Sequence, residues 1–369
     1  MSNKTLGILA VIAAVFLTLA IVVSTGPETS PTDMTKARYL IGNIEPGVIS
    51  KIHIGRGEDA VTLNNTAKGF TVENKDGYPA KTAEINNLIN TCIDIKISEL
   101  YTDDPKNHTD LGVTEEKTRN LVKFFKEDGS LLTGVIIGDT KQTGEGTYIR
   151  MPGSDEVYVT LDNPYFRTGA INYVNEQITE TLSREQVETV MVDTPQSTYV
   201  LSENENGDIV PDQTLDGNLK STEAANVFTA LSSLRFNDVS KGAQGLTFTS
   251  KYICNTTDDI KYTLRLAQKN DKTFVKCSAV YEGTLPSKSM QVESPEALKE
   301  KEAKYLANET AQKFKQRHKG WTYEISSQSA KNLTKPLTEL FEKPQPTETA
   351  DPNAPAGPAE KPDSGKVDK

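Results

Sequence analysis

Cysteine, histidine and tryptophan are scarce in this chain of 369 residues, which has three cysteines, three histidines and one tryptophan. Cys92, Cys254 and Cys277 form no Cys-x-x-Cys pair, and an odd number of cysteines does not imply a disulfide framework or a zinc ribbon. A single disulfide between Cys254 and Cys277 stays open as an alternative. Cys92 falls on an apolar helical stripe, which predicts an inert buried thiol rather than a nucleophile.

The sequence also lacks an excess of positive charge. Its formal net charge is −10, whereas a nucleic-acid-binding face needs clustered lysine and arginine. The same deficit argues against broad electrostatic docking on anionic lipid. We therefore expect no nucleic acid partner.

No catalytic motif stands out. The sequence has no His-Glu-x-x-His zinc motif, nucleophile elbow or phosphate-binding glycine loop. Gly55-Arg56-Gly57 lacks the third glycine of a dinucleotide fingerprint. No cofactor is predicted, and the sequence favours a non-enzymatic protein without deciding the question.

One long hydrophobic run is present, at the N-terminus. Residues 5–27 carry no charge and residues 6–23 are almost wholly apolar, enough at about 1.5 Å per residue to span a bilayer core of about 30 Å. We interpret residues 1–24 as a transmembrane signal anchor, with a cleaved signal peptide as the rival, and residues 25–43 as a linker. Lys4 favours a cytoplasmic N-terminus, so the expected location is the cell membrane, single-pass, with the body in the periplasm or on the outer face.

The rest of the sequence contains an internal repeat. A shift of 138 or 139 positions carries Ile49 onto Val187, Ile52 onto Val190, Ile54 onto Val192, Lys81 onto Lys220, Glu84 onto Glu223 and Leu88 onto Val227. Alternation of apolar and polar residues is typical of half-buried strands, and each copy adds one amphipathic helix. The sequence therefore predicts an α+β fold of two tandem duplicated modules, residues 44–182 and 183–342, each a mainly antiparallel sheet with one packed helix.

In the first module, Thr82 is expected to cap a helix whose buried stripe is Ile85, Leu88, Ile89 and Cys92. The expected strands are Val61–Leu63, Phe70–Glu73, Leu121–Phe125, Gly134–Ile137, Thr147–Met151 and Val157–Thr160.

In the second module, Ser221 is the expected helix cap, and Ile260, Tyr262 and Leu264 are matched to Leu121, Lys123 and Phe125. A charged helix over Pro295–His318, capped by Ser294 and stopped by Gly320, is interpreted as an insertion near residues 287–320. A strand over Trp321–Ile325 and a short helix over Leu333–Phe341 follow. Residues 343–369 are rich in proline, glutamate and alanine, which predicts a disordered tail.

Two groups of residues are candidate sites. Tyr148, Arg150 and Tyr158 fall on neighbouring predicted strands, where such a set can bind a carboxylate or a sugar, although cross-strand packing explains it as well. The acidic loop with Asp103, Asp104, His108 and Asp110 offers oxygens and an imidazole to a metal, although a solvated loop is the favoured interpretation. No catalytic residue and no firm metal site is predicted.

Several of these motifs resemble domain-of-unknown-function family 4340. The resemblance rests on Asp110-Leu-Gly112-Val113, Leu121–Phe125, Asp128-Gly129, Ile137-Gly138, Gly146-Thr-Tyr148-Ile-Arg150, Val157-Tyr158 and the segment Asp76–Ile89. It covers roughly residues 44–341 and is clearest in the first module. It implies a bacterial protein with an N-terminal membrane helix and an exported body. Some members accompany gliding-motility-type ABC transporters.

Two functions are consistent with the sequence. The first is a non-catalytic accessory or binding subunit of a membrane assembly, such as an ABC-type transporter. The alternative is an envelope receptor or enzyme that binds a ligand or glycan in a cleft between the modules. The oligomeric state is not indicated.

Overall fold

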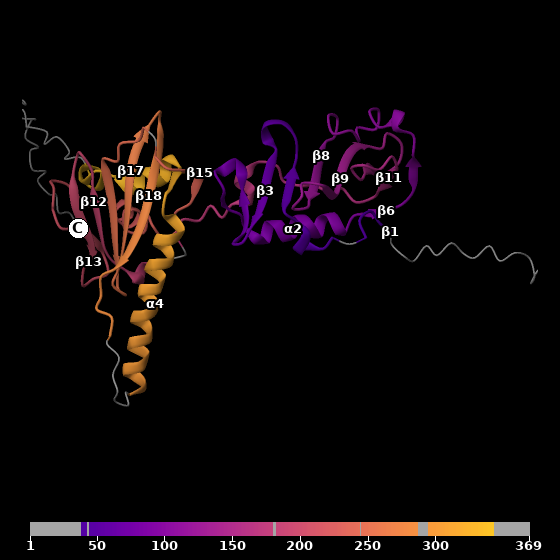
Figure 1. Cartoon of the computed structure of the whole chain (residues 1–369). Helices are drawn as coiled ribbons and strands as arrows, with labels where there is room; N and C mark the ends of the chain where they lie inside the picture. The colour runs from indigo at the N-terminus through magenta and orange to yellow at the C-terminus, as the bar shows by residue number, and fades with distance from the viewer. Residues whose placement is uncertain (1–37, 43, 180–181, 244, 287–293, 343–369) are drawn as a thin grey trace, which may run out of the picture. The chain divides into compact units, whose positions relative to one another are not determined.

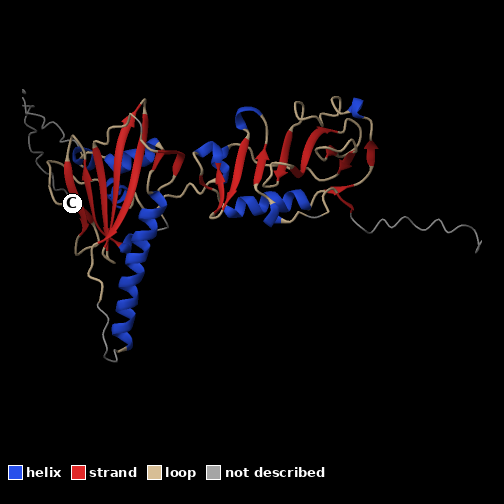
Figure 2. Cartoon of the chain, viewed as in Figure 1, coloured by secondary structure: helices blue, strands red, loops and turns tan. Residues whose placement is uncertain are grey.

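The computed structural model describes residues 38–42, 44–179, 182–243, 245–286 and 294–342 (Figure 1). The chain divides into two compact units, of which unit 1 ends at Asn175 and unit 2 begins at Glu176. Both are α+β, and the strand pairs within the described residues are antiparallel (Figure 2). The predicted fold class is confirmed at this level.

Unit 1 is built on a nine-stranded sheet with the order β5-β4-β3-β2-β8-β9-β10-β11-β7. Its strands are β2 (Lys51–Ile54), β3 (Val61–Thr66), β4 (Gly69–Val72), β5 (Tyr78–Pro79), β7 (Leu100–Thr102), β8 (Asn120–Phe125), β9 (Leu131–Thr140), β10 (Thr147–Arg150) and β11 (Val157–Thr160). A two-stranded sheet pairs β1 (Arg38–Tyr39) with β6 (Lys96–Ile97). The helix is α2 (Thr82–Ile93), and short 3₁₀ turns are η1 (Pro46–Val48), η2 (Gly57–Asp59), η3 (Glu73–Lys75), η4 (Pro105–Asn107) and η5 (Ala170–Tyr173).

The main core of unit 1 lies between one face of this sheet and α2. Ile52 and Ile54 of β2 are fully buried, because alternate residues of a strand point to the same face. The α2 stripe Ile85, Leu88, Ile89 and Cys92 is buried as predicted. Thr82 is the first helical residue rather than the cap, a role that falls to Lys81 without a side-chain cap bond.

The opposite face of β8 to β11 carries a second, smaller core. It is closed by residues 103–119, which connect β7 to β8 and which we call the cover segment. The core residues are Leu111, Val113, Leu121, Ile136, Tyr148, Val157 and Val159. The cover segment lies so close to β9 that a Cβ atom added at Gly138 would sit 2.3 Å from the Leu111 carbonyl oxygen.

Unit 2 is built on an eight-stranded sheet with the order β14-β13-β12-β16-β17-β18-β19-β15. Its strands are β12 (Val187–Asp193), β13 (Thr198–Glu203), β14 (Ile209–Pro211), β15 (Phe236–Lys241), β16 (Ser250–Thr256), β17 (Ile260–Lys269), β18 (Lys272–Tyr281) and β19 (Trp321–Ile325). Its helices are α3 (Ser221–Phe228), α4 (Pro295–His318) and α5 (Ser327–Thr334), with the 3₁₀ turns η6 (Arg184–Gln186) and η7 (Leu337–Leu340).

All three helices of unit 2 cover the same face of the sheet. The Tyr252 hydroxyl donates to the Val227 carbonyl of α3 over 2.8 Å, and the Tyr199 hydroxyl donates to the Lys335 carbonyl, just after α5, over 2.8 Å. Tyr199 and Tyr252 both lie opposite Val192, so they share a face. On that same face Tyr262 meets Phe314 of α4 edge-on, with ring centroids 5.0 Å apart.

Helix α4 has the predicted bounds and ends. The Ser294 side chain accepts a hydrogen bond from the Ala297 N–H over 3.2 Å, and Pro295 stands in the first turn. Gly320, with φ of +85°, follows the helix, as expected where the chain leaves a helix in a left-handed conformation. Residues 287–293 of the predicted insertion lie outside the described residues.

The strand order of unit 2 repeats that of unit 1. From β14 to β15, its eight strands take the places of β4, β3, β2, β8, β9, β10, β11 and β7. This order corrects one prediction, because β16 rather than β17 takes the place of β8, so Ile260 does not correspond to Leu121. Neighbouring strands can share the same alternation of apolar and polar residues, so this pattern does not identify which strand of unit 2 corresponds to β8.

Four further predictions differ from the structure. Lys220, not Ser221, occupies the N-cap of α3. The terminal segment is split into α5 and η7 by Pro336, which has no N–H to continue a helix. The unit boundary precedes residue 182, because Ile178 is fully buried and its N–H donates to the Leu234 carbonyl of unit 2. Residues 38–42 of the expected linker belong to unit 1, where Leu40 and Ile41 are buried.

The predicted anchor, residues 1–24, and the predicted tail, residues 343–369, lie outside the described residues. Within the described ranges, no helix combines the length and the apolar character needed to cross a membrane.

Candidate functional site

The predicted Tyr148, Arg150 and Tyr158 set is divided between two faces of the sheet. Tyr158 lies directly opposite Ile149 in the β10–β11 pair, so it shares the face of Ile149 and not that of its neighbours Tyr148 and Arg150. Tyr148 packs against Tyr101 with ring centroids 4.7 Å apart, and burial, aided by a hydrogen bond with Tyr101, raises the pKa of Tyr148 to about 12. The Tyr158 hydroxyl donates to Glu156 over 2.7 Å and accepts from Arg38 over 3.1 Å, and the hydrogen bond to Glu156 is the main cause of its raised pKa.

Arg150 binds the cover segment through hydrogen bonds to its backbone. Its Nε and Nη2 atoms donate to the Val113 carbonyl over 3.0 and 2.9 Å, and Nη1 donates to the Ser154 carbonyl over 2.7 Å. Burial lowers the pKa of the guanidinium. Each of its three nitrogens is thus engaged by backbone oxygen, an arrangement that stabilises the loop.

The acidic loop forms the start of the cover segment. Asp104 caps η4 by accepting from the Lys106 N–H over 3.0 Å, and the buried His108 ring directs Nε2 to the Asp155 carbonyl at 3.0 Å. Asp103 and Asp110 belong to the same loop and are exposed. Among the described residues, no three histidine, cysteine or carboxylate side chains are grouped so as to hold a metal ion.

The three cysteines are buried free thiols. Cys254 and Cys277 occupy non-adjacent strands, β16 and β18, and are not joined. Burial raises the pKa of all three thiols, that of Cys254 to about 12. A thiol must ionise to act as a nucleophile, so this environment suits a packing role.

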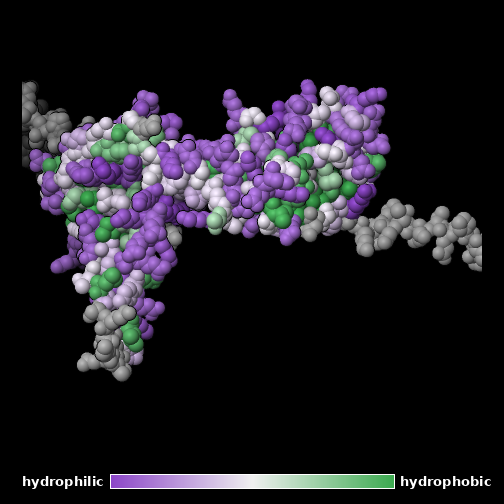
Figure 3. Space-filling model, in the orientation of Figure 1, coloured by the Kyte–Doolittle hydropathy of each residue, from purple (hydrophilic) through white to green (hydrophobic). Residues whose placement is uncertain are grey.

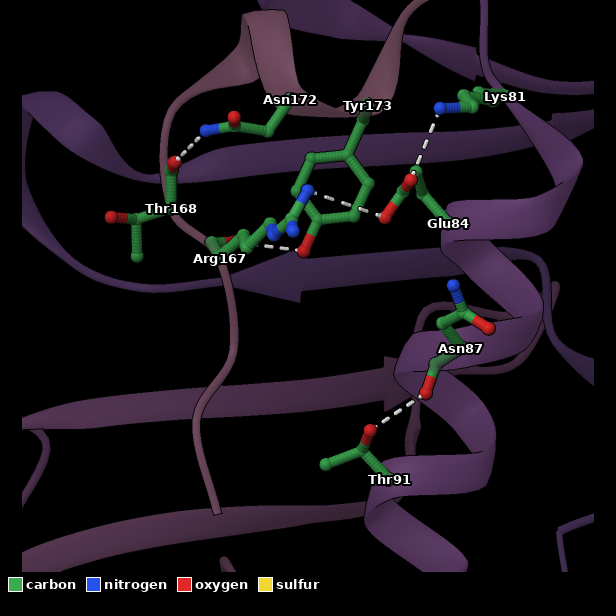
Figure 4. Close-up of polar contacts among 8 residues, drawn as sticks. All are labelled: Lys81, Glu84, Asn87, Thr91, Arg167, Thr168, Asn172 and Tyr173. Carbon is green, nitrogen blue, oxygen red and sulfur yellow. Dashed lines mark hydrogen bonds and ion pairs between the residues drawn. The ribbon is translucent and has the colours of Figure 1, made fainter. Parts of the chain in front are cut away.

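A pocket of about 190 Å³ lies beside α2 in unit 1. We call it the α2 pocket; it is lined by Glu84, Asn87, Leu88, Thr91, Tyr165, Phe166, Arg167 and Tyr173. Helix α2 supplies one wall, with positions 84, 87, 88 and 91 on one helical face, and the segment between β11 and η5 supplies the other (Figure 4). Buried Leu88 and Phe166 are its apolar residues.

Glu84 is the electrostatic centre of the α2 pocket. Its carboxylate lies between two cations, with Lys81 Nζ at 3.2 Å and Arg167 Nη1 at 3.8 Å (Figure 4). The Tyr173 hydroxyl donates to the Arg167 carbonyl over 2.8 Å. Burial and, second, the charge of Glu84 raise the pKa of Tyr173, so the phenol stays neutral.

Backbone hydrogen bonds join the pocket wall opposite α2 to the residues that precede the helix. The Lys81 N–H donates to the Tyr173 carbonyl over 2.7 Å, and Ala80 bridges Val174. Unit 2 repeats this junction, where the Lys220 N–H donates to the Leu340 carbonyl over 2.8 Å and Leu219 bridges Phe341. Glu223 there pairs with Lys335 as Glu84 pairs with Arg167.

Sequence reasoning did not find the α2 pocket. The repeat matched Lys81 and Glu84 with Lys220 and Glu223, which was the available signal that these residues occupy equivalent places at the start of a helix in the two units. It did not identify Arg167, because the segments after β11 and β19 differ in length and structure.

A second candidate surface lies on α4. Ala307, Ala311 and His318 of this helix are buried, whereas Leu298, Tyr305 and Leu306 are 54%, 48% and 59% exposed. At about 100° per residue, Ala307 lies half a turn round the helix from Leu298. Figure 1 shows the first turns of α4 extending past the end of the sheet of unit 2, and Figure 3 shows hydrophobic residues on this projecting end.

Comparison with known proteins gives one match. A family model described as a domain of unknown function, DUF4340, matches residues 71–265, from β4 in unit 1 to β17 in unit 2. No curated protein and no solved structure matches the chain.

Proposed function

The chain belongs to the domain-of-unknown-function family DUF4340, and from this premise we propose that it is a membrane-anchored, non-catalytic accessory subunit that binds another protein of a membrane assembly. The anchor is the apolar run of residues 6–23. With Lys4 before that run, the two units would lie outside the cytoplasm.

The outward face of α4 is the observation that carries this proposal. Leu298, Tyr305 and Leu306 are spaced i, i+7 and i+8, the spacing of anchors that a helix inserts into a partner's groove. The opposite face already packs on β17 and β18. Large apolar side chains that stay exposed on a projecting helix are typical of a protein interaction surface.

The charges around these residues indicate what occupies the surface. Glu302 and Glu309 alternate with Lys299, Lys301 and Lys313 on this helix. An anionic surface, such as anionic lipid or nucleic acid, would attract the lysines but repel the two glutamates. The partner we propose is therefore a protein surface with an apolar centre and charges of both signs.

Two finer proposals follow from the family and the fold. The resemblance to relatives that accompany ABC-type exporters makes an exporter subunit the first partner to test. We also infer that units 1 and 2 arose by tandem duplication, since their common strand order and their matching Ala80–Val174 and Leu219–Phe341 bridges support a shared origin.

The test is a mild-detergent pull-down of the full-length chain, compared with Leu298→Asp/Leu306→Asp. Because buried anchors contribute most of the binding energy, we expect the double variant to bind its membrane partner about tenfold or more weakly. Leu131→Asp, at a residue 39% exposed in unit 1, is the matched control and should bind normally. A photo-cross-linker at position 306 should label the same partner.

Two outcomes would count against the proposal. One is a partner whose recovery is unchanged by the double variant, and the other is the lack of any reproducible membrane partner. A partner identified as an exporter subunit would support the finer proposal as well.

A further inference from the structure

The α2 pocket has the size of a site for one chemical group. Its volume of about 190 Å³ is below the roughly 300 Å³ at which pockets begin to enclose a whole drug-sized ligand. The occupant that fits is therefore a single side chain or a small head group.

Its charges favour an anion. Glu84 carries one negative charge, and Lys81 and Arg167 carry two positive charges, so the group has a net charge of +1. The 3.8 Å separation of Arg167 from Glu84 is too long for a hydrogen bond. The guanidinium therefore keeps N–H donors for a carboxylate, which it can bind through two parallel hydrogen bonds.

Polar groups beside the arginine are also available. Among the described residues, the Asn87 side-chain amide has no hydrogen-bond partner, although the Asn87 carbonyl accepts from the Thr91 hydroxyl over 2.8 Å. An amide offers both a donor and an acceptor. Figure 4 shows Asn87 and Thr91 on the side of α2 that faces the Arg167–Thr168 segment.

The rim of the pocket carries an exposed aromatic side chain. Tyr165 lines the pocket and is 71% exposed. It gives a contact area that a free small anion would not use. A peptide that places one carboxylate in the pocket could cover this ring.

Unit 2 differs at the equivalent place. There the chain between the last strand and the 3₁₀ turn forms α5, whose Leu333 is fully buried. In unit 1 the same connection, residues 161–169, forms no helix and borders the α2 pocket. Both units share the backbone junction described above. The α2 pocket lies where they differ, because the connection in unit 1 forms no helix.

We propose that the α2 pocket binds the carboxylate side chain of a protein partner, with Arg167 and Asn87 as its ligands and Tyr165 as its apolar rim. This inference rests on the proposed function, because the carboxylate is supplied by a protein. It identifies a second contact, in unit 1, with a different chemistry from that of α4.

The test uses the full-length chain in detergent, with nuclear magnetic resonance signals of the Asn87 amide and the Arg167 guanidinium as readouts. The probe is an Ac-Leu-Glu-Tyr-amide peptide, and the neutral Ac-Leu-Gln-Tyr-amide is its matched control. We expect saturable shifts with the glutamate peptide only. Arg167→Gln should weaken its binding about tenfold or more, since a charge-assisted bond is lost.

Arg235→Gln is the control variant. Arg235 is 65% exposed and pairs with Glu176 at 3.3 Å, much as the 63% exposed Arg167 pairs with Glu84. It should bind the glutamate peptide normally. Equal shifts with both peptides, the same affinity in Arg167→Gln, or tighter binding of free acetate than of the peptide would each overturn the inference.

The two proposals can fail separately. If the glutamate peptide binds but no membrane partner is recovered, the proposed function is wrong and the carboxylate site is supported. A partner that depends on Leu298 and Leu306 but ignores Arg167→Gln would remove the carboxylate site alone.

Discussion

His318 is buried in unit 2, in an environment that disfavours the protonated, charged imidazole. It is 2% exposed at the end of α4, its Nδ1 lies 2.7 Å from the Tyr323 hydroxyl, and its ring centroid lies 4.3 Å from that of Phe314. Its Nε2 has no hydrogen-bond partner among the described residues. Burial first, and then the charge of Arg317, lower the pKa of the imidazole to about 4, while the Ile178 backbone opposes the shift.

This pKa predicts how the stability of unit 2 depends on pH. Unfolded His318 has its ordinary pKa of about 6.5, so between pH 6.5 and about 4 the unfolded chain binds the extra proton. The free energy of unfolding should therefore fall by about 3 kcal/mol as the pH drops through that window, and the loss should level off below pH 4. Urea unfolding followed by Trp321 fluorescence measures it, since this single tryptophan lies on β19.

Two variants separate this histidine from other titrating groups. His318→Phe keeps an aromatic ring and should flatten the pH dependence in this window. Tyr323→Phe removes the hydroxyl that faces Nδ1 but keeps the histidine, so the dependence should persist. An unchanged slope in His318→Phe would contradict the assignment.

The sequence located His318 correctly at a helix end but not its surroundings. A histidine at a helix C-terminus is expected to be favoured as a cation. In the structure the ring turns inward onto Phe314 and Tyr323, so burial outweighs the helix dipole. The packing partners come from two elements, α4 and β19, which no local pattern brings together.

At the scale of elements, the cover segment is the least predictable part of unit 1. Residues 103–110 were expected to form a solvated acidic loop, and the sequence did not indicate that Leu111 and Val113, which follow them, close the second core or that Arg150 binds the Val113 carbonyl. Strands β8 to β11 were predictable because short runs of β-branched and aromatic residues bounded by glycine-containing turns are local information. Which loop covers their second face depends on contacts between residues distant in sequence, such as Val113 and Arg150.

Gly138→Ala tests the fit of the cover segment. The added methyl would meet the Leu111 carbonyl oxygen at 2.3 Å and Val113 Cγ1 at 2.6 Å, and backbone atoms yield poorly. Overpacking of this kind costs about 1–3 kcal/mol, so residues 103–119 should show faster amide hydrogen exchange and unit 1 should melt at a lower temperature. Gly47→Ala, where no atom lies within 4 Å of the added methyl, is the control. Equal exchange rates in both variants would show that the cover segment is not packed as described.

At the scale of the whole molecule, the repeat explains the agreement between sequence and structure, and also the main error. Matching Ile52 with Val190 places β12 where β2 lies, in the middle of its sheet. Matching Leu121 with Ile260 skips a strand, because the connection from β15 to β16 is shorter than the cover segment that joins β7 to β8. Offsets measured along a sequence shift wherever a connection differs in length between the two units, whereas the order of strands in a sheet does not.

The N-terminal run predicts where this molecule is located. Residues 6–23 contain no charged side chain, and each charge at the centre of a membrane helix would cost about 2.5–3.5 kcal/mol. We therefore expect the full-length chain to stay in the membrane fraction after washes with high salt and alkaline carbonate, and a chain without residues 1–24 to be released. Intact-mass measurement of the protein in the membrane and soluble fractions separates the two interpretations of the run. A mass that includes residues 1–24 supports an anchor, whereas a mass reduced by about that segment, with the protein in the soluble fraction, shows a cleaved signal peptide and places the contact with any membrane partner on the two units alone.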